Sequence, residues 1–511
     1  MKSCTAKKWC CFVLVILVLY LSALFLNIDL GYFFKRFSHL GDIAGQMFPP
    51  EWSYAFDVIS PVLTTVQMSI TGTFLGSFLA LLFAPLCGKT IGFPIWLRGI
   101  FKFLIQILRS FPALILALAA TFVFGLGTFA GTVALLVYTF AIMTRLTYED
   151  IESAYQGAYK ALRTMGAGRY SAFFRTVLPE ILSSYLTNAL YMLESNVRQS
   201  AILGYVGAGG IGLLLNEKMS WREYGKAGMI LAALFVTVCI IEWLSHYLAS
   251  LVRHERKTST VGKTIIWSLL GLIFIVSTVL LKAPDFGHTS LTVIRNMLSG
   301  FLHPDLSLIT DFSQSGLLYL LLETICISLV GTFLGAVIAL LLAVLNTSKL
   351  MPKPVSLLFR LLVMAIRSVP FIIYGLIFVR VTGQGAFTGV LTLAVCSVGL
   401  LTKRFTEAID ALKMSAYNAL KTMGVPTISC IRYALIPQLW PVLASSVLYR
   451  FDVNIREASI LGLVGAGGIG TPLIFAMNHY NWDTAGSICL GLIVIVWLID
   501  LFSMKMRKKL S

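Results

Sequence analysis

The stretch Asn196-Val-Arg-Gln-Ser-Ala-Ile-Leu-Gly-Tyr-Val-Gly-Ala-Gly-Gly-Ile-Gly212 returns 258 positions later as Asn454-Ile-Arg-Glu-Ala-Ser-Ile-Leu-Gly-Leu-Val-Gly-Ala-Gly-Gly-Ile-Gly470. A shorter stretch repeats with the same offset, since Arg109-Ser-Phe-Pro112 matches Arg367-Ser-Val-Pro370. Self-similarity over this span indicates two copies of one structural unit. We therefore predict two halves, residues 1–257 and residues 258–511.

The composition indicates a chain that lies mostly inside a membrane. Of its 511 residues, 58% are hydrophobic and only 12% are charged, whereas soluble domains carry about 25% charged residues. One helical crossing needs about 20 apolar residues. We expect an all-α polytopic protein with about 12 transmembrane helices, six in each half, near residues 10–27, 61–86, 99–124, 128–147, 179–199, 226–250, 264–282, 315–345, 357–380, 386–402, 437–455 and 484–503.

The positive charge fits the same interpretation. The net charge of +17 arises largely from Lys and Arg at the ends of apolar runs, which is typical of cytoplasmic loops of membrane proteins. We therefore predict contact with membrane lipid and no nucleic-acid partner, with both termini in the cytoplasm. Nine cysteines lie at irregular spacing without a C-x-x-C motif, so no metal site is predicted. An even number of crossings in each half gives the two copies the same orientation.

Each half contains one long polar loop, at about 148–179 and 403–437. In the first loop, Ala, Leu, Met and Lys between Ala158 and Met165 favour a helix, and Gly166 ends it. Gly166 precedes Pro179 by the same distance that separates Gly424 from Pro437. Loops usually vary faster than the segments they connect. The shared spacing therefore favours a functional loop over an ordinary connection.

These loops resemble the EAA loop of ABC importer permeases, in which Glu-Ala-Ala, a glycine and a later Leu-Pro stand at fixed spacing. In that family the loop helix docks into a groove of the ATPase subunit. The resemblance assigns ATPase docking to residues of both loops, although Lys160 and Asn418 replace the glutamate. The residues so assigned are Ala161, Leu162, Gly166, Pro179, Ala419, Leu420, Gly424 and Pro437.

The wider pattern is similar to phosphonate/phosphite ABC importer permeases. It comprises Arg-Ser-x-Pro, the glycine-containing stretch Gly125–Gly131, the EAA-type loop and Asn-x-Arg followed by the glycine signature. The resemblance implies a type I importer permease fold with two permease copies fused in tandem. It also implies a bacterial inner (cell) membrane location, an extracytoplasmic binding protein, and two cytoplasmic ABC ATPases that bind ATP and Mg.

The chain itself is expected to have no catalytic site. Gly88-Lys-Thr90 looks like the end of a phosphate-binding loop, but Phe83 occupies the position of the required first glycine. The spacing of Gly207, Gly209 and Gly212 matches the dinucleotide fingerprint, yet it follows a membrane helix rather than a strand. ATP hydrolysis is therefore assigned to partner subunits.

Several repeated polar and glycine residues are candidates for the translocation path or its gate. A charge at membrane depth usually faces a bundle interior, and arginine suits oxyanions. Two alternatives stay open: Glu194 and Asp452 lie at salt-bridge spacing from two of the arginines, and the glycines also suit tight helix packing. The candidates are Arg109, Asn196, Arg198, Gly207, Gly209, Gly210, Arg367, Asn454, Arg456, Gly465, Gly467 and Gly468.

A secondary transporter with two six-span halves is the alternative function. Such a protein runs on an ion gradient and carries acidic or His residues inside its spans as relays. Few are present, and Glu194, Asp452 and Asp57 are the nearest candidates. The sequence therefore favours the ATP-driven importer.

Overall fold

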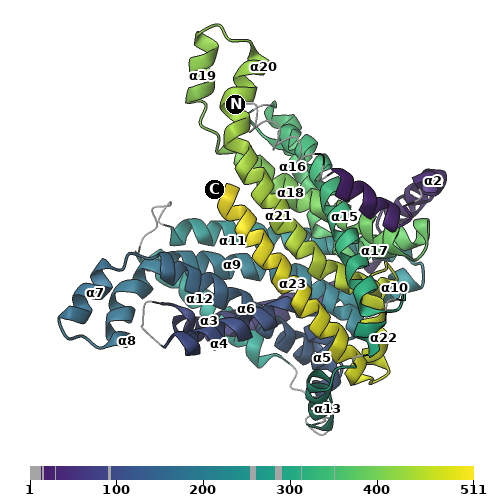
Figure 1. The fold of residues 1–511 in the computed structure, drawn as a ribbon, viewed down its shortest axis with the longest axis horizontal. Helices are drawn as coiled ribbons and strands as arrows, with labels where there is room; N and C mark the ends of the chain where they lie inside the picture. The colour runs from purple at the N-terminus through teal and green to yellow at the C-terminus, as the bar shows by residue number, and fades with distance from the viewer. Residues whose placement is uncertain are drawn as a thin grey trace. The chain divides into compact units, whose positions relative to one another are not determined.

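The computed structural model describes Val13 and residues 16–28, 30–89, 94–253, 260–281, 291–305, 307–311, 313–349 and 351–510. These residues form helices joined by short connections, and the described part of the chain contains no strand (Figure 1). The predicted all-α fold is therefore confirmed.

The chain divides into two units. One consists of residues 45–295, and the other consists of residues 1–44 together with residues 296–511. We call them the first and the second unit. Helix α2 (Leu30–Met47) crosses their boundary. The helices of the first unit are η1 (Trp52–Tyr54), α3 (Ala55–Cys87), α4 (Ile95–Ser110), α5 (Ala113–Phe124), α6 (Thr128–Ser153), α7 (Gly157–Thr164), α8 (Arg169–Ala172), η2 (Phe173–Val177), α9 (Leu178–Leu203), η3 (Gly204–Val206), α10 (Ile211–Ser220), α11 (Tyr224–Val252) and α12 (Thr260–Val279).

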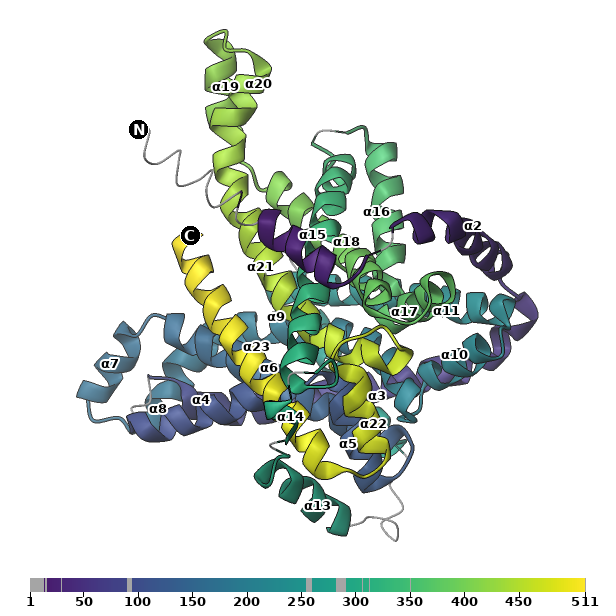
Figure 2. The same ribbon diagram turned by 45° about the vertical axis from the view of Figure 1, so that its right-hand side comes forward.

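The second unit repeats this order from α15 onward, so that α15 corresponds to α3 and α23 to α11. Short helices α19 and α20 extend beyond α18 and α21, as α7 and α8 extend from the first unit (Figures 1 and 2). The helices are α13 (Leu291–Leu302, at the unit boundary), α14 (Ser307–Thr310), α15 (Leu317–Asn346), α16 (Lys353–Ser368), α17 (Phe371–Thr382), α18 (Ala386–Asp410), α19 (Ser415–Thr422), α20 (Thr427–Cys430), η5 (Ile431–Leu435), α21 (Ile436–Leu461), η6 (Gly462–Val464), α22 (Gly470–Asn478) and α23 (Trp482–Leu510).

The helix that opens each sequence half packs in the unit built mainly from the other half. Near the N-terminus, the ring of Phe25 lies 5.2 Å from that of Tyr319. In the first unit, Phe74 of α3 stacks on Phe274 of α12 with ring centroids 3.7 Å apart. The boundaries of the units at Ala44 and Asn296 therefore differ from the sequence halves that meet at residue 257.

Two predicted single crossings are bent helix pairs. The expected spans at 99–124 and 357–380 are each interrupted, between α4 and α5 by a bend of 90° and between α16 and α17 by a bend of 86°. Pro112 and Pro370 lie at these breaks, where proline removes a backbone donor and disfavours helix in the residue before it. Each of the two predicted crossings is therefore a broken helix pair, either one bent span or a re-entrant loop, and the sequence-based prediction did not include the break.

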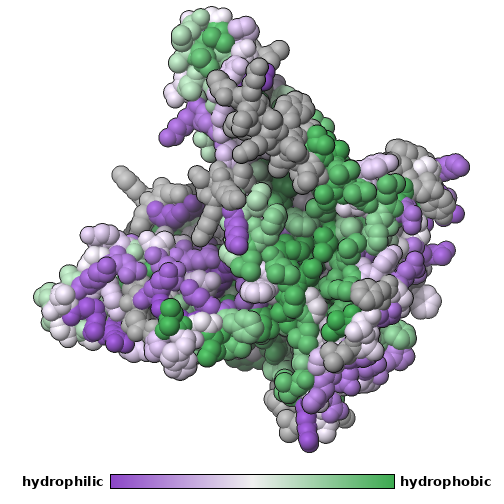
Figure 3. Space-filling model, viewed as in Figure 1, coloured by the Kyte–Doolittle hydropathy of each residue, from purple (hydrophilic) through white to green (hydrophobic). Residues whose placement is uncertain are grey.

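Six of the described helices are long and apolar enough to cross a membrane, or up to eight if each bent pair is one span. Helices α9 and α21 coincide with predicted spans but carry more polar side chains and are not among the six. Apolar side chains spread over the surface of the second unit's long helices (Figure 3). On α15 they include Leu318, Leu322, Phe333, Val337 and Leu341.

Candidate functional site

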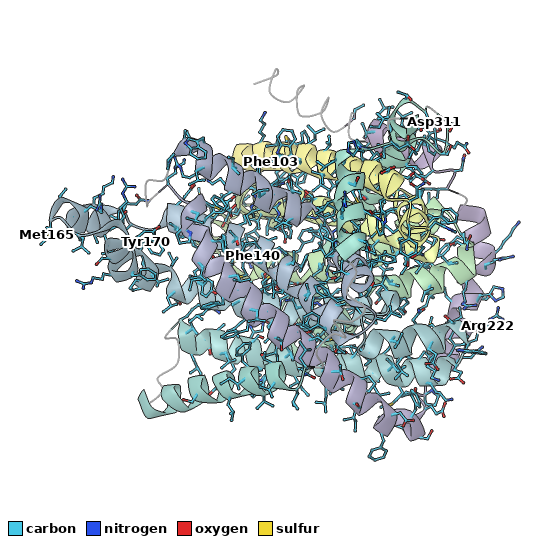
Figure 4. The ribbon with its side chains drawn as sticks, turned by 90° about the horizontal axis from the view of Figure 1, so that it is seen from below. Phe103, Phe140, Met165, Tyr170, Arg222 and Asp311 are labelled. Carbon is cyan, nitrogen blue, oxygen red and sulfur yellow. The ribbon has the colours of Figure 1, made fainter. Side chains whose placement is uncertain are left out.

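The polar loop of the first unit forms a helical hairpin, α7–α8, at one end of that unit. Met165, at its tip, is 80% exposed, and Figure 4 shows Met165 and Tyr170 at the opposite end of the unit from Arg222. Gly166 has a φ of +88°, and the N–H of Ala167 donates to the carbonyl of Leu162 at 3.0 Å. This is the glycine helix stop that the sequence predicts.

The hairpin of the first unit is anchored by an apolar cluster at its base. Tyr159 of α7 is buried against Ile151 of α6 and Phe173 of η2, together with Ala84 and Val177. Leu162 packs against the same cluster. The opposite face of α7 is exposed and carries Ala161 and Lys160. The loop therefore offers a short helix with one anchored face and one open face.

The second unit builds the same hairpin from α19 and α20. Its tip residue Met423 is 77% exposed, and Gly424 has a φ of +76°. The N–H of Val425 donates to the carbonyl of Leu420 at 3.2 Å. No residue of α19 is buried, so this hairpin has less apolar anchoring than its counterpart.

The predicted docking residues occupy equivalent places in the two hairpins. Leu162 and Leu420 are half-buried, whereas the other predicted docking residues are exposed. Their contact with an ATPase stays a prediction. The exposed ones are Ala161, Gly166, Pro179, Ala419, Gly424 and Pro437.

A π-helical turn joins each hairpin to the long helix that follows it. These turns are η2 and η5, and in each the next N–H bonds five residues back, from Leu178 to Phe173 and from Ile436 to Ile431. Pro179 and Pro437 come directly afterwards. A proline has no N–H and its ring clashes with the carbonyl four residues before it, which favours a widened turn. These turns were not predicted from the sequence.

The two glycine-containing stretches of each unit contact one another. The N–H of Gly127 donates to the carbonyl of Gly207 at 3.0 Å, and the N–H of Gly385 donates to the carbonyl of Gly465 at 2.9 Å. A Cβ on Gly210 would lie 2.7 Å from Thr65 Oγ1 of α3. The signature therefore packs tightly against neighbouring helices. Its predicted role as a gate stays a prediction.

The other signature glycines also pack closely against neighbouring atoms. A Cβ on Gly209 would lie 2.8 Å from Thr128 Cγ2, and one on Gly468 would lie 2.9 Å from Thr324 Oγ1. A Cβ on Gly467 would lie 2.8 Å from the Ala386 backbone. Positive φ angles, which glycine adopts readily, occur at Gly207, Gly209, Gly210, Gly465, Gly467 and Gly468.

The repeated asparagine joins three helices in each unit. Asn196 of α9 is fully buried, and its Nδ2 donates to Thr73 Oγ1 of α3 and Thr139 Oγ1 of α6, both at 2.7 Å. In the second unit, Asn454 Nδ2 donates to Thr332 Oγ1 at 2.6 Å and Ser397 Oγ at 2.8 Å. In this conformation both asparagines lie inside the helix packing.

The repeated arginines after these asparagines form ion pairs within their helices. Arg198 Nη1 lies 2.8 Å from Glu194 Oε1, and Arg456 Nη2 lies 2.6 Å from Asp452 Oδ2. The structural alternative predicted from the four-residue spacing is thus present in both units. A role along the anion path stays a prediction.

The other two arginines mark the bends in the broken helices. Arg109 lies in the last turn of α4 and Arg367 in the last turn of α16. Both side chains are half-buried. A Cβ on Gly399 of α18 would lie 2.8 Å from Cγ of Arg367, so the stem of this arginine packs closely on that helix.

The second unit also contains charged contacts that the sequence analysis missed. Arg450 is 3% exposed and its Nη2 lies 2.7 Å from Glu457 Oε2. Glu323 Oε2 accepts the N–H of Gly468 at 3.1 Å. In the first unit, Met192 and Gln199 stand at the positions that correspond to Arg450 and Glu457. Comparing the two copies position by position could have revealed this difference.

The described residues bring together no group of three or more His, Cys, Asp or Glu side chains that could hold a metal ion.

Comparison with known proteins gives matches in both halves. The family model described as "Binding-protein-dependent transport system inner membrane component" matches residues 72–254 and 331–510. A phosphate-import permease protein, PhnE, from Mycolicibacterium smegmatis is 27% identical over 91% of this chain and 88% of its own length. A phosphite transport system permease protein, PtxC, from Stutzerimonas stutzeri is 35% identical over 37% of this chain and 69% of its own length.

Other matches are more distant. An ABC transport system permease protein, p69, from Mycoplasma pneumoniae is 23% identical over 90% of this chain and 88% of its own length. A solved inward-facing structure of the MetNI methionine ABC transporter matches 37% of this chain and 93% of the solved chain, with 20% identity and a TM-score of 0.33.

Proposed function

Because the chain belongs to the family of binding-protein-dependent transport system inner membrane components, we propose that it carries a phosphorus oxyanion across the bacterial inner membrane. The chain is a multi-pass permease subunit of an ABC importer, with two permease repeats in one polypeptide. The proposed substrate class is phosphonate, phosphite or phosphate. It is supported by relatives named as phosphate-import and phosphite transport permeases.

The hairpins α7–α8 and α19–α20 are the proposed docking sites for two ATPase subunits. Each presents a short helix with an exposed methionine at its tip, Met165 or Met423. Each tip has a basic residue nearby, Arg163 in the last turn of α7 and Lys421 in the last turn of α19. An exposed apolar tip with a basic residue beside it fits a groove that is apolar at its floor and acidic at its rim. The two ATPases would bind ATP and Mg in the cytoplasm.

The path from the docking hairpin to the membrane helices runs through continuous helical structure. In the first unit, α8, η2 and α9 follow one another from Arg169 to Leu203 without a gap. Asn196 on α9 is hydrogen-bonded to α3 and α6. A movement imposed on the hairpin would therefore shift α9 together with these two helices, and packed helices move as bodies rather than bending gradually. The observation that carries the proposal is the presence of this arrangement in both units.

Substrate selection is assigned to an extracytoplasmic binding protein. The half-buried arginines Arg198 of α9 and Arg456 of α21 are already paired with acids, since Arg198 contacts Glu194 and Arg456 contacts Asp452. A guanidinium that is neutralised by a carboxylate attracts an anion less strongly. The permease would thus provide a transient path rather than a tight site.

Uptake into proteoliposomes tests the proposal. The chain, its ATPases and its binding protein would be reconstituted and supplied with labelled phosphite, methylphosphonate or inorganic phosphate, with and without internal ATP. We expect uptake of at least one of the three that requires ATP and persists when an ionophore dissipates ion gradients. Uptake that continues without ATP and stops with the ionophore would instead support the secondary transporter, and uptake of none would refute the substrate class.

A further inference from the structure

The docking loops lack the glutamate after which the EAA loop is named, because Lys160 and Asn418 stand at its positions. The structure contains a hydrogen-bonded contact at the base of each hairpin, made by equivalent residues of the two units. The inference below rests on the proposed docking function.

In the first unit the contact joins the start of the hairpin to the helix that follows it. Tyr155 lies between the end of α6 at Ser153 and the start of α7 at Gly157. Its backbone N–H donates to Oε1 of Glu180 at 2.8 Å. Glu180 is in the first turn of α9, directly after Pro179. The bond therefore closes the hairpin across its base.

The second unit makes the same closure with an amide in place of the carboxylate. Oε1 of Gln438 accepts the N–H of Lys413 at 3.3 Å, and its Nε2 lies 3.4 Å from the carbonyl oxygen of Lys413. Nε2 also donates to the carbonyl of Ala434 in the π-helical turn, at 2.7 Å. The bonded residues are 25 positions apart in both units.

We propose that Glu180 and Gln438 are positioning residues that clamp the docking hairpins to α9 and α21, so that force from the ATPases reaches the membrane helices. The turns η2 and η5 between hairpin and helix are π-helical, so they interrupt the regular α-helical hydrogen bonding at the base of each hairpin. A hairpin joined to α9 or α21 only through such a turn could pivot. The clamp links the segment that enters the hairpin to the same long helix that follows the hairpin, which restricts that pivot.

The two hairpins differ in how much they depend on their clamps to stay fixed to the membrane helices. In the first unit, Tyr159 and Leu162 of α7 also pack in the apolar cluster at the base. In the second unit no residue of α19 is buried. The second hairpin therefore depends more on its clamp, and loss of Gln438 should have the larger effect.

The shared chemistry of the clamps defines the variants that test them. A carboxylate and an amide both offer an oxygen that accepts a backbone N–H, whereas alanine offers none. Glu180→Gln should therefore keep the clamp, and Glu180→Ala and Gln438→Ala should break it. Glu149→Ala is the matched control, because Glu149 is an exposed carboxylate near the end of α6 and pairs with Arg145 at 2.8 Å instead of with the hairpin.

The first measurement is the number of substrate molecules taken up per ATP hydrolysed by the reconstituted complex, with phosphite, methylphosphonate and inorganic phosphate as probes. We expect Glu180→Ala to lower this ratio by about three- to tenfold, the range that loss of one hydrogen bond of ordinary strength predicts. Gln438→Ala should lower it further. Glu180→Gln and Glu149→Ala should stay within about twofold of the wild type. An unchanged ratio in both alanine variants would overturn the proposal.

The second measurement is the rate of trypsin cleavage within the hairpin, which does not depend on transport. Trypsin cleavage after Lys160, Arg163 and Arg169 of the purified full chain is followed by mass spectrometry. Glu180→Ala should be cleaved faster than wild type at these sites, whereas Glu180→Gln should not. Equal cleavage would contradict the clamp even if no probe is transported. A wild-type chain that takes up no probe and binds no ATPase would refute the proposed function instead.

Discussion

At the scale of single residues, the glycine stops of the docking helices are the most direct test of the docking assignment. Gly166 and Gly424 have positive φ angles with open space around them. An L-residue there is strained by about 1–2 kcal/mol although nothing blocks its side chain. We expect the double variant Gly166→Val, Gly424→Val to lower ATP-driven uptake by roughly tenfold while ATP hydrolysis continues, as measured in proteoliposomes.

A glycine in the same hairpin supplies the control for this prediction. Gly168 has a φ of −60° and also has open space around it. Gly168→Val should therefore leave uptake close to the wild-type value. Unchanged uptake in the double variant, or equal loss in the control, would remove the docking assignment from these glycines.

The buried ion pair of the second unit predicts a different pattern. Glu457→Gln leaves Arg450 buried without its carboxylate, which should lower the free energy of unfolding by about 3–5 kcal/mol. Arg450→Met combined with Glu457→Gln recreates the Met192 and Gln199 pair of the first unit. We expect the double variant to recover most of the loss, as measured by thermal unfolding of the purified chain. A double variant less stable than the single one would contradict this interpretation.

Residue spacing alone predicted one kind of ion pair and missed another. The four-residue spacing of Glu194 and Arg198 indicates a contact within one helix, and the structure contains it. Arg450 and Glu457 are seven residues apart on α21. Contact over two turns requires an extended arginine held by neighbouring packing, here with Ser397 of α18. That packing is a tertiary property and was not available from the sequence.

At the scale of elements, the exposed tips of the two hairpins should carry the ATPase contact. Met165→Asp and Met423→Asp place a charge on tips that are 80% and 77% exposed. Folding should change little, because substitutions at exposed sites usually alter stability by less than about 0.5 kcal/mol. We expect the double variant to lose co-purifying ATPase while its melting temperature is retained. Full retention of the ATPase would show that the tips do not dock.

The sequence predicted the docking helix more accurately than the helices that support it. A helix ending before Gly166 was expected over residues 158–165, and α7 covers Gly157–Thr164. Composition and a glycine stop suffice for such a local element. The bends at Pro112 and Pro370 were missed because the apolar runs continue through them. Each proline was a visible signal, since the residue before it disfavours the helical conformation.

At the scale of the whole molecule, the repeat was the decisive signal. The predicted tandem permease is confirmed by a family match in each half. The first helix of each sequence half belongs to the unit formed mainly by the other half, and this was not predicted. It depends on contacts between segments far apart in the chain. In one of them, Gln67 Nε2 donates to the carbonyl of Ser277 at 2.9 Å. Periodicity identifies a helix but does not specify its distant partner.

The number of ATPase subunits bound to one chain tests the central claim most directly. Native mass spectrometry of the complex, purified gently from its own membranes, gives this number. Two docking hairpins in one polypeptide predict one copy of this chain with two ATPase subunits. A stable complex of two copies of this chain with two ATPases, or a chain without any ATPase in a detergent that preserves other ABC complexes, would contradict the account.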